Sequence, residues 1–247
     1  MKIIGLIPSR LASTRLPDKP LKLICGIPLI AHVIKRSQMC SLLDDLYVAT
    51  DSQEIAEIAA QCNCKVIFTK NHHLTGSDRI GEAVQSLECD IIVNIQGDEA
   101  LVHPEHIRDS ANLILKNSAI EVAMLATPFY KKDSRSDVKV VINSNHEIIC
   151  FSRADIPFKA NNMNKAYHVV SFTKKMLANF CALSRTPIEI IESIEYMRLI
   201  ESGIKIGIKV VDSKAISVDT EEDLISVSNM MEYDDLYHSY KNDFSHK

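Results

Sequence analysis

Arg10, Arg15 and Lys19 stand with Ser13 and Thr14 in a short segment that directly follows an apolar run typical of a strand. Guanidinium groups form planar forks and an ammonium group is a point charge, and both match the oxygens of a phosphate. Open α/β sheets bind ligands at the carboxyl ends of their strands, where this segment would lie. The glycines of a Walker loop or a G-x-G-x-x-G turn are absent. The composition favours a polyphosphate site, and the alternative is a solvated surface loop.

Two acidic stretches offer oxygen ligands for a divalent cation. Gly97 and Asp98 follow the apolar run Ile91–Ile95, so the backbone can be approached closely beside a hard carboxylate of the kind that Mg²⁺ prefers. Asp219 lies farther along the chain, where a following threonine and three acids also predict an N-capped helix start. A metal site requires the fold to bring Asp219 beside Asp98. Otherwise the first stretch is an acidic turn and the second a helix cap.

Thr75, Gly76 and Ser77 open a predicted helix. A helix N-terminus with hydroxyl groups and a glycine can contact an anion or a nucleobase, and it can equally be a simple cap. His72 and His73, just before it, favour a polar loop over a metal site, because no cysteine or carboxylate stands at ligand spacing from them.

The elements that must position these residues alternate between strand and helix in the first half of the chain. The predicted strands are 2–8, 46–50, 65–69 and 91–95, and the predicted helices are 28–39, a helix capped at Asp51 or Ser52, 77–87 and one starting near Pro104. This order indicates a doubly wound α/β layer, mostly parallel, with helices on both faces.

The second half changes character. It predicts strands at 121–127, 138–142, 147–151 and 205–210, a hairpin turn at 143–145, helices at 174–183 and 188–202, and a long C-terminal helix from Thr220. We therefore expect one domain in three parts. These are a doubly wound half at 1–127, an inserted mixed-sheet region at 128–212, and a return segment at 213–247.

Composition excludes several classes of protein. The chain has 247 residues, of which 46% are hydrophobic and 24% charged, so it is no disordered chain, collagen repeat or coiled-coil rod. A net charge of −4 gives no basic field for nucleic acid, and no run reaches the roughly 18 apolar residues of a membrane span. Seven scattered cysteines and the lack of a secretory signal indicate reduced thiols. We expect a cytoplasmic protein that binds neither nucleic acid nor membrane.

Six motifs occur in an order that resembles the 3-deoxy-manno-octulosonate (Kdo) cytidylyltransferases, over nearly the whole chain. They are Arg10-x-x-Ser13-Thr14-Arg15-Leu16-Pro17-x-Lys19-Pro20-Leu21, Ala49-Thr50-Asp51, Gly76-Ser77-Asp78-Arg79, Asn94-x-Gln96-Gly97-Asp98-Glu99, Phe151-Ser152-Arg153-Ala154-x-Ile156-Pro157 and Val218-Asp219-Thr220-x-Glu222-Asp223-Leu224. The resemblance implies a Rossmann-like nucleotidyltransferase fold, CTP and an acidic 2-keto sugar as substrates, Mg²⁺ as cofactor, a homodimer and a part in lipopolysaccharide biosynthesis. It also implies that the half at 1–127 binds the nucleotide and that the insertion at 128–212 serves sugar binding and dimerisation.

The resemblance also implies roles for individual residues. Lys19, Arg15 and Asp98 would be catalytic, and Asp98 and Asp219 would bind Mg²⁺. The residues implied for the nucleotide are Arg10, Ser13, Arg15, Lys19, Thr75, Gly76, Ser77 and Gln96. The residues implied for the sugar are Gln96, Arg153, His168, Glu195, Tyr196 and Asp219. The sugar's anomeric hydroxyl would attack the α-phosphorus of CTP, a step that needs in-line positioning and neutralised phosphate charge.

The sequence departs from the family pattern at three notable positions. Asp18 replaces a glycine beside the lysine, Val170 replaces a glycine, and Tyr196 replaces a glutamine that contacts the sugar. Because two of these fall on the sugar side, we expect a reshaped acceptor pocket. Two alternatives to Kdo transfer therefore stay open. The first is a cytidylyltransferase for another acceptor, such as an amino-Kdo or a nonulosonic acid, and the second is a catalytically weak paralogue that binds nucleotide.

Overall fold

The computed structural model describes residues 1–12, 15–73, 75–213 and 216–244. The strands are β1 (Ile3–Pro8), β2 (Leu23–Ile24), β3 (Ile27–Pro28), β4 (Asp45–Thr50), β5 (Lys65–Phe68), β6 (Ile91–Ile95), β7 (Val122–Phe129), β8 (Lys139–Ile142), β9 (Ile148–Ser152), β10 (Met163–Thr173) and β11 (Ile206–Val210). The helices are α1 (Leu29–Gln38), α2 (Gln53–Gln61), α3 (Gly76–Ala83), α4 (Pro104–Lys116), α5 (Lys174–Ala182), α6 (Pro187–Glu192), α7 (Met197–Glu201), α8 (Glu221–Met231) and α9 (Asp235–Tyr240), with short 3₁₀ turns at Lys19–Leu21, Val84–Ser86 and Lys241–Phe244.

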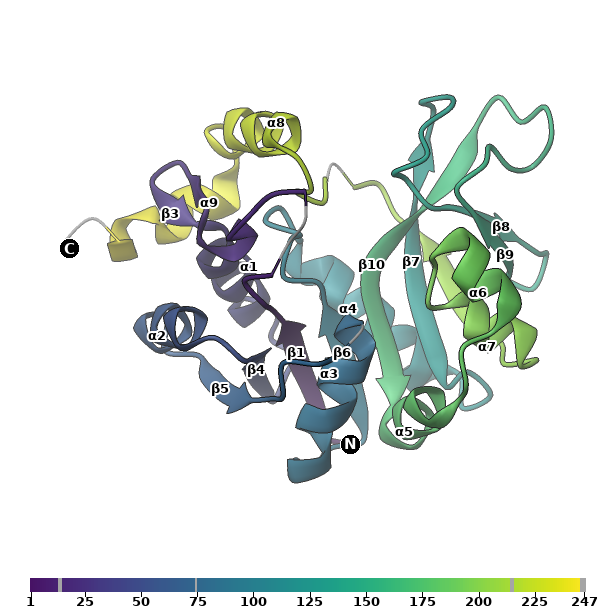
Figure 1. Cartoon of the computed structure of the whole chain (residues 1–247), viewed down its shortest axis with the longest axis horizontal. Coiled ribbons are helices and arrows are strands. Elements are labelled where there is room, and N and C mark those ends of the chain that lie inside the picture. The colour runs from purple at the N-terminus through teal and green to yellow at the C-terminus, as the bar shows by residue number, and fades with distance from the viewer. Residues whose placement is uncertain (13–14, 74, 214–215, 245–247) are drawn as a thin grey trace.

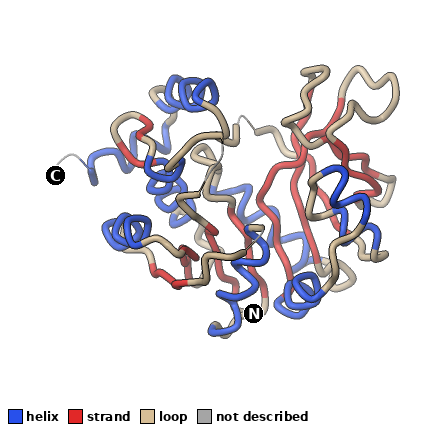
Figure 2. The backbone as a smooth tube through the Cα atoms, in the orientation of Figure 1, coloured by secondary structure: helices blue, strands red, loops and turns tan. Residues whose placement is uncertain are grey.

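One mixed sheet runs through the molecule, with helices on both faces (Figures 1 and 2). Its main path is β11-β7-β10-β6-β1-β4-β5, and β8 and β9 extend from β10. Strands β6, β1, β4 and β5 are parallel, as the sequence predicted. Every residue of β1 and β6 is buried, which is why both read as continuous apolar runs. The loops that leave the carboxyl ends of β1 and β6 are therefore neighbours.

Two hydrophobic cores cover the two faces of the sheet. On one face α1, α2 and α4 pack against it through residues such as Ile30, Ile55 and Ile107. On the other face α3 and α5 do so through residues such as Ile80 and Leu177. This three-layer arrangement confirms the predicted doubly wound fold.

Strand β10 is the main feature that the sequence analysis missed. It has 11 residues and lies antiparallel between β6 and β7, so the region from 128 to 212 supplies a central strand of the sheet. A bulge between Tyr167 and Val170 shifts its register. Polar residues such as Asn164, Lys165 and His168 also interrupt the apolar alternation that marks a half-buried strand.

Two predicted helices are wrong in extent. The helix expected at 188–202 is two short ones, α6 and α7, because the chain turns at Ser193, which has φ of 54°. The C-terminal helix ends at Met231 and a separate helix, α9, follows. The predicted hairpin is confirmed, since β8 and β9 pair antiparallel around residues 143–145. No described helix is long and apolar enough to cross a bilayer.

Candidate active site

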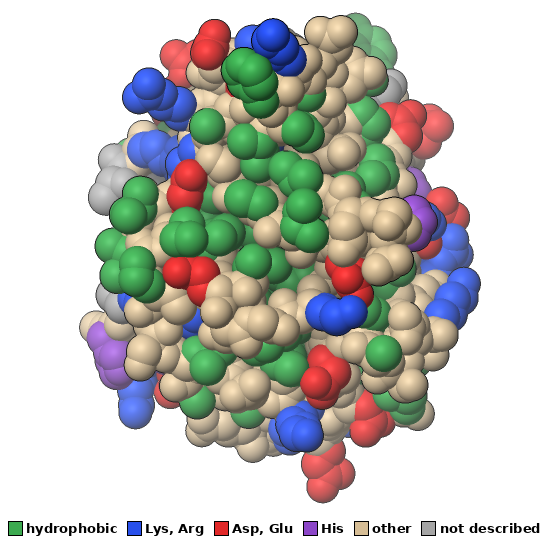
Figure 3. Space-filling view, turned by 90° about the vertical axis from the view of Figure 1, so that its right-hand side faces the viewer, with side chains coloured by type: hydrophobic (Ala, Val, Ile, Leu, Met, Phe, Trp, Pro, Cys, Tyr) green, Lys and Arg blue, Asp and Glu red, His purple; other side chains and the backbone are tan. Residues whose placement is uncertain are grey.

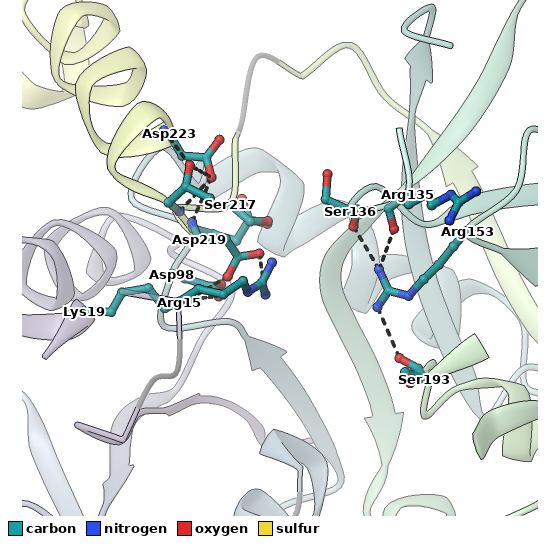
Figure 4. Close-up of polar contacts among 12 residues, drawn as sticks. Arg15, Lys19, Asp98, Arg135, Ser136, Arg153, Ser193, Ser217, Asp219 and Asp223 are labelled. Atoms are coloured by element: carbon teal, nitrogen blue, oxygen red, sulfur yellow. Dashed lines mark hydrogen bonds and ion pairs between the residues drawn. The ribbon is translucent and has the colours of Figure 1, made fainter. Parts of the chain in front are cut away.

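Asp98 and Asp219, which lie far apart in the sequence, come together with Lys19 of the first loop at the carboxyl edge of the sheet. Lys19 Nζ lies 2.7 Å from Asp98 Oδ2 and 3.0 Å from Asp219 Oδ1. Arg15 Nη2 lies 3.0 Å from Asp219 Oδ2 (Figure 4). Asp98 and Asp219 are therefore brought together, which was the condition for a metal site. Burial alone would lower the pKa of Lys19, but the two carboxylates outweigh it and the pKa is raised, so the lysine is positively charged at neutral pH.

Asp98 and Asp219 are positioned largely by backbone contacts. Gly97 lies so close to β1 that an added Cβ would be 2.8 Å from the Pro8 carbonyl oxygen, so this position requires glycine. The Val218 N–H donates to the Asp98 carbonyl oxygen at 3.0 Å. The Asp219 N–H donates to Asp223 Oδ2 at 3.1 Å, next to the capping box that Thr220 and Asp223 form at the start of α8. The predicted N-cap at Thr220 is thus confirmed, and it places Asp219 at the site.

Glu99 is a residue whose position the sequence analysis did not foresee. Its side chain is buried and accepts a hydrogen bond from the Ser217 hydroxyl, while its other oxygen has no described partner. Burial, and then the charge of Asp98, raise the pKa of Glu99 to about 7. The contact ties the loop after β6 to the segment before Asp219. A carboxylate directly after Asp98 was the available signal, but nothing in the sequence showed which of the two faces the protein interior.

A cavity of about 330 Å³ lies over the loop after β1 and the start of α3. Its walls include most of the residues implied for the nucleotide, namely Arg10, Arg15, Lys19, Thr75, Gly76 and Gln96. Ser13 lies outside the described residues. Ser77 does not line this cavity: its side chain is fully buried, and its hydroxyl donates to Glu195 Oε1 at 2.8 Å.

The residues around Thr75 form an ordered helix start. Thr75 caps α3 through a capping box with Asp78, so the cap is confirmed. Arg10 Nη1 donates to the His73 carbonyl oxygen at 3.1 Å, and His73 pairs with Glu82. In the described part of the chain no group of three or more metal-ligating side chains is assembled, at the histidines or elsewhere.

A second and larger cavity, of about 710 Å³, adjoins the first. The two share four wall residues, Arg15, Gln96, Asp98 and Asp219. The other residues implied for the sugar, Arg153, His168, Glu195 and Tyr196, line the larger cavity alone. A ligand in each cavity would therefore meet the other at the Asp98–Asp219 pair.

Arg153 lines the far side of the larger cavity, and the buried Lys139 contacts Arg153 and Asp137, which also lines it. The Arg153 guanidinium donates to four backbone carbonyl oxygens at 2.8–3.3 Å, and Figure 4 shows it among three of the residues concerned. These carbonyl groups belong to Arg135, Ser136, Glu192 and Ser193. The fully buried Lys139 ammonium donates to the carbonyl oxygens of Ser134, Asp137 and Arg153 at 2.6–2.9 Å. Both cations hold loops together.

His168 and Glu195 have pKa values shifted by burial. Burial lowers the pKa of His168, and the positive charge of Lys165 acts in the same direction against the pull of Asp98. Burial raises the pKa of Glu195, and the hydrogen bonds from Thr75 and Ser77 oppose it only in part. The Ser77–Glu195 contact joins the start of α3 to the connection between α6 and α7, and thus one cavity wall to the other.

The three departures from the family pattern lie in different surroundings. Val170 is fully buried within the sheet and lines neither cavity. Tyr196 packs among Phe151, Phe172 and Phe180, with its ring 6.1 Å from that of Phe180, and its hydroxyl accepts a hydrogen bond from Asn94. The expectation that Val170 fills the acceptor pocket is therefore wrong.

Asp18, the third departure, is exposed and has φ of 53°. This left-handed conformation explains why a glycine suits the position.

The chain matches known proteins over most of its length. A family model described as cytidylyltransferase matches residues 4–206. The 3-deoxy-manno-octulosonate cytidylyltransferases of Nitratiruptor sp. and Bdellovibrio bacteriovorus are 37% and 36% identical to it, covering 90% and 94% of this chain and 97% and 98% of theirs. A solved structure of CMP:2-keto-3-deoxy-manno-octonic acid synthetase complexed with CTP is 32% identical, with a TM-score of 0.90 over 94% of this chain and 99% of that one. The chain therefore belongs to the family of the 3-deoxy-manno-octulosonate cytidylyltransferases.

Proposed function

We propose that this protein transfers CMP from CTP to the anomeric hydroxyl of an acidic 2-keto sugar, Kdo or a close relative, and releases pyrophosphate. The observation that carries the proposal is the junction of two cavities at one charged cluster, Lys19 with Asp98 and Asp219. Family membership supports cytosine as the base and Kdo as the acceptor. The same membership supports a place in lipopolysaccharide biosynthesis.

The residues of this chain would act by charge and position. Arg10, Arg15 and Lys19 would hold the phosphates of CTP along the smaller cavity, leaving the α-phosphorus at the junction. The acceptor hydroxyl would approach from the larger cavity, form a bond to the α-phosphorus and displace pyrophosphate. Such a step depends on alignment and on neutralising charge on the phosphate oxygens, which these cations supply.

We propose Mg²⁺ as the cofactor, held by Asp98 and Asp219. Two adjacent carboxylates fit this ion, because Mg²⁺ in nucleotide enzymes takes one or two carboxylates and completes its shell with phosphate oxygens and water. Bound there, Mg²⁺ would neutralise phosphate charge during transfer. In this structure the Lys19 ammonium lies between the same two carboxylates, and its positive charge offsets part of their negative charge.

We propose a homodimer located in the cytoplasm. Hydrophobic side chains gather on the side of the molecule that carries α6 and β9 (Figure 3). Ile149, Ile188, Ile190 and Ile191 are exposed there by 43–82%. Clustered exposed apolar side chains mark association surfaces in soluble proteins. None of the seven cysteines, all of which lie in described parts of the chain, forms a disulfide, which supports a reducing compartment.

The decisive experiment is pyrophosphate release from CTP and Mg²⁺ with a panel of acceptors: Kdo, 8-amino-Kdo and a nonulosonic acid. We expect release with Kdo, and melting-temperature shifts with CTP that ATP and GTP do not reproduce, since a ligand that binds only the native state stabilises it. Release with another acid alone would reassign the acceptor. Binding of CTP without release for any acid would identify a weak paralogue. Equal shifts with ATP would contradict cytosine selectivity.

A further inference from the structure

The larger cavity holds a charged pair to which no role has yet been given. Lys165, on β10, has its Nζ 3.1 Å from Asp137 Oδ1, and the two side chains are 18% and 23% exposed. The same Nζ lies 5.5 Å from the centre of the Phe129 ring. All three residues line the larger cavity and none lines the smaller one. They therefore belong to the cavity proposed for the acceptor and not to the one proposed for the nucleotide.

The pair is held in place on both sides. Ser134 Oγ donates to Asp137 Oδ2 at 2.6 Å, which leaves Oδ1 for Lys165. Burial alone would raise the pKa of Asp137, but the Ser134 hydroxyl and the Lys165 charge outweigh it, so the carboxylate is ionised at neutral pH. Lys165 is fixed by β10, where it lies opposite Thr127 of β7 and Lys139 of β8.

The chemistry of the pair favours hydroxyl groups over a second anion. Asp137 would repel a carboxylate that approached Lys165, since like charges in one site disfavour each other. An ammonium group that pairs with one carboxylate oxygen still has N–H donors that can bind a ligand. A carboxylate oxygen can accept hydrogen bonds from more than one donor. A donor and an acceptor side by side, next to an aromatic ring, suit a short chain of carbon atoms that carry hydroxyl groups.

Two other cations that line this cavity are less free than Lys165, whereas a third, Lys131, is exposed. The Arg153 guanidinium is bonded to four carbonyl oxygens, and Arg15 is paired with Asp219 at the junction. Lys165 also lines the cavity, and its charge is balanced by the neighbouring Asp137.

We propose that Lys165 and Asp137 bind the exocyclic hydroxyl groups of the acceptor and so select acids with a long carbon chain. The inference rests on the proposed function. In a 2-keto sugar acid of eight carbons that closes a six-membered ring, two hydroxylated carbons remain outside the ring. A six-carbon homologue has none. Lys165 would donate to one exocyclic hydroxyl and Asp137 would accept from another, which makes the pair a determinant of specificity.

The test compares kcat/KM for the eight-carbon and six-carbon 3-deoxy-2-keto acids, with CTP and Mg²⁺, in wild type and Lys165→Met. We expect wild type to prefer the longer acid, and the variant to lose about tenfold to a hundredfold of that preference through the longer acid alone, as for a lost hydrogen bond to a charged group. Lys165→Gln keeps a donor and should retain part of the preference. Lys175→Met, at an exposed lysine of α5, is the matched control.

Each result has a distinct meaning. Equal losses for both acids, an unchanged preference in Lys165→Met, or no preference in wild type would overturn the role of Lys165. Wild type that turns over neither acid would instead refute the proposed function, and the inference with it. Because Lys165→Met could disturb folding, the CTP-induced melting shift of each variant is measured first. If that shift is lost in Lys165→Met, the comparison is made with Lys165→Gln and Asp137→Asn, where an unchanged chain-length preference in both would equally overturn the proposal.

Discussion

The cations of the smaller cavity, here the nucleotide wall, bond differently from most of those at the far side of the larger cavity, here the acceptor wall. Lys165, which pairs with Asp137, is the exception on the acceptor wall. On the nucleotide wall, Lys19 and Arg15 contact carboxylate side chains at 2.7–3.0 Å. On the acceptor wall, Arg153 and Lys139 donate to backbone carbonyl oxygens. Figure 4 shows Lys19 and Arg15 beside Asp98 and Asp219 on one side and Arg153 with its partners on the other.

The difference indicates that the first set of cations can take part in the reaction, whereas the second set fixes the shape of the site. Pairs of side chains can exchange partners when a phosphate or a metal ion arrives, because neither member is part of the backbone and both remain partly exposed. A buried cation bonded to carbonyl groups instead fixes the course of several chain segments, since each carbonyl left without its donor is costly. Charge changes at the paired side chains of the nucleotide wall should therefore act on turnover, and changes at the carbonyl-bonded cations of the acceptor wall, Arg153 and Lys139, should act on stability.

Asp98→Asn should have the largest effect, and on turnover. It removes a carboxylate from the junction while Lys19 keeps Asp219 as a partner, so we expect a loss of about 10²–10³-fold in kcat, the size seen when one preorganised electrostatic contact is removed. The melting temperature should change little. Pyrophosphate release and thermal melting measure the two quantities, and Asp235→Asn on α9 is the control. Near-normal turnover in a folded Asp98→Asn protein would remove Asp98 from the site.

Lys139→Met should show the reverse behaviour. It leaves three carbonyl oxygens without a donor in a fully buried place, which should cost about 3 kcal/mol of unfolding free energy. Urea unfolding measures this cost. Lys205→Met, at a lysine that is 65% exposed and paired with Glu147, should cost well under about 1 kcal/mol. Equal costs for the two variants would contradict the distinction between the walls.

Glu99 gives a pH test of the link between the loop after β6 and Ser217. Its pKa is raised from an ordinary value of 4.5 to about 7, so the folded state holds the proton more tightly than the unfolded state. The stabilisation is complete below pH 4.5 and is lost as the pH rises through 7. Relative to Glu99→Gln, wild type should lose about 3 kcal/mol of stability across this range.

Urea unfolding between pH 4.5 and 8, in EDTA, measures the Glu99 effect. Glu57→Gln, at an exposed position of α2, should follow wild type. Parallel pH curves for wild type and Glu99→Gln would show that the carboxyl group is not titrating in this window.

Asp18→Gly should have the smallest effect. Glycine relieves the left-handed conformation at φ of 53°, but it also gives the unfolded chain more freedom, so the unfolding free energy should rise by no more than about 1 kcal/mol. Turnover should stay within a few-fold, since Lys19 pairs with Asp98 and Asp219 and Asp18 is exposed. A large gain in turnover would instead show that the acid hinders the neighbouring lysine.

The parallel part of the sheet was predictable because local signals agreed. β1 is apolar throughout and β6 is apolar except for Asn94, and Ser52, Thr75 and Thr220 cap α2, α3 and α8 in the predicted way. β10 was not predictable, because its pairing partners β6 and β7 lie far away in sequence and it carries cavity residues on a central strand.

For the site, the sequence predicted the residue types but not their surroundings. Asp98 and Asp219 are 121 positions apart, and only the fold shows that one lysine contacts both. The sequence also could not show that Val170 belongs to the core, that Tyr196 packs among phenylalanines, or that the donors of Arg153 are bonded to carbonyl groups. Each of these facts depends on which face of an element a side chain occupies.

The place of β10 in the sheet also sets a condition on how the chain can be made. As the protein leaves the ribosome, β6 is complete by residue 95, but its second neighbour, β10, ends only at Thr173. For the time needed to synthesise about 80 residues, at 5–20 residues per second, β6 is an apolar strand with an unpaired edge. Such edges promote pairing with other chains. A nascent chain stalled at residue 127, or a fragment cut there, would keep that edge of β6 open and so be prone to pair with other chains.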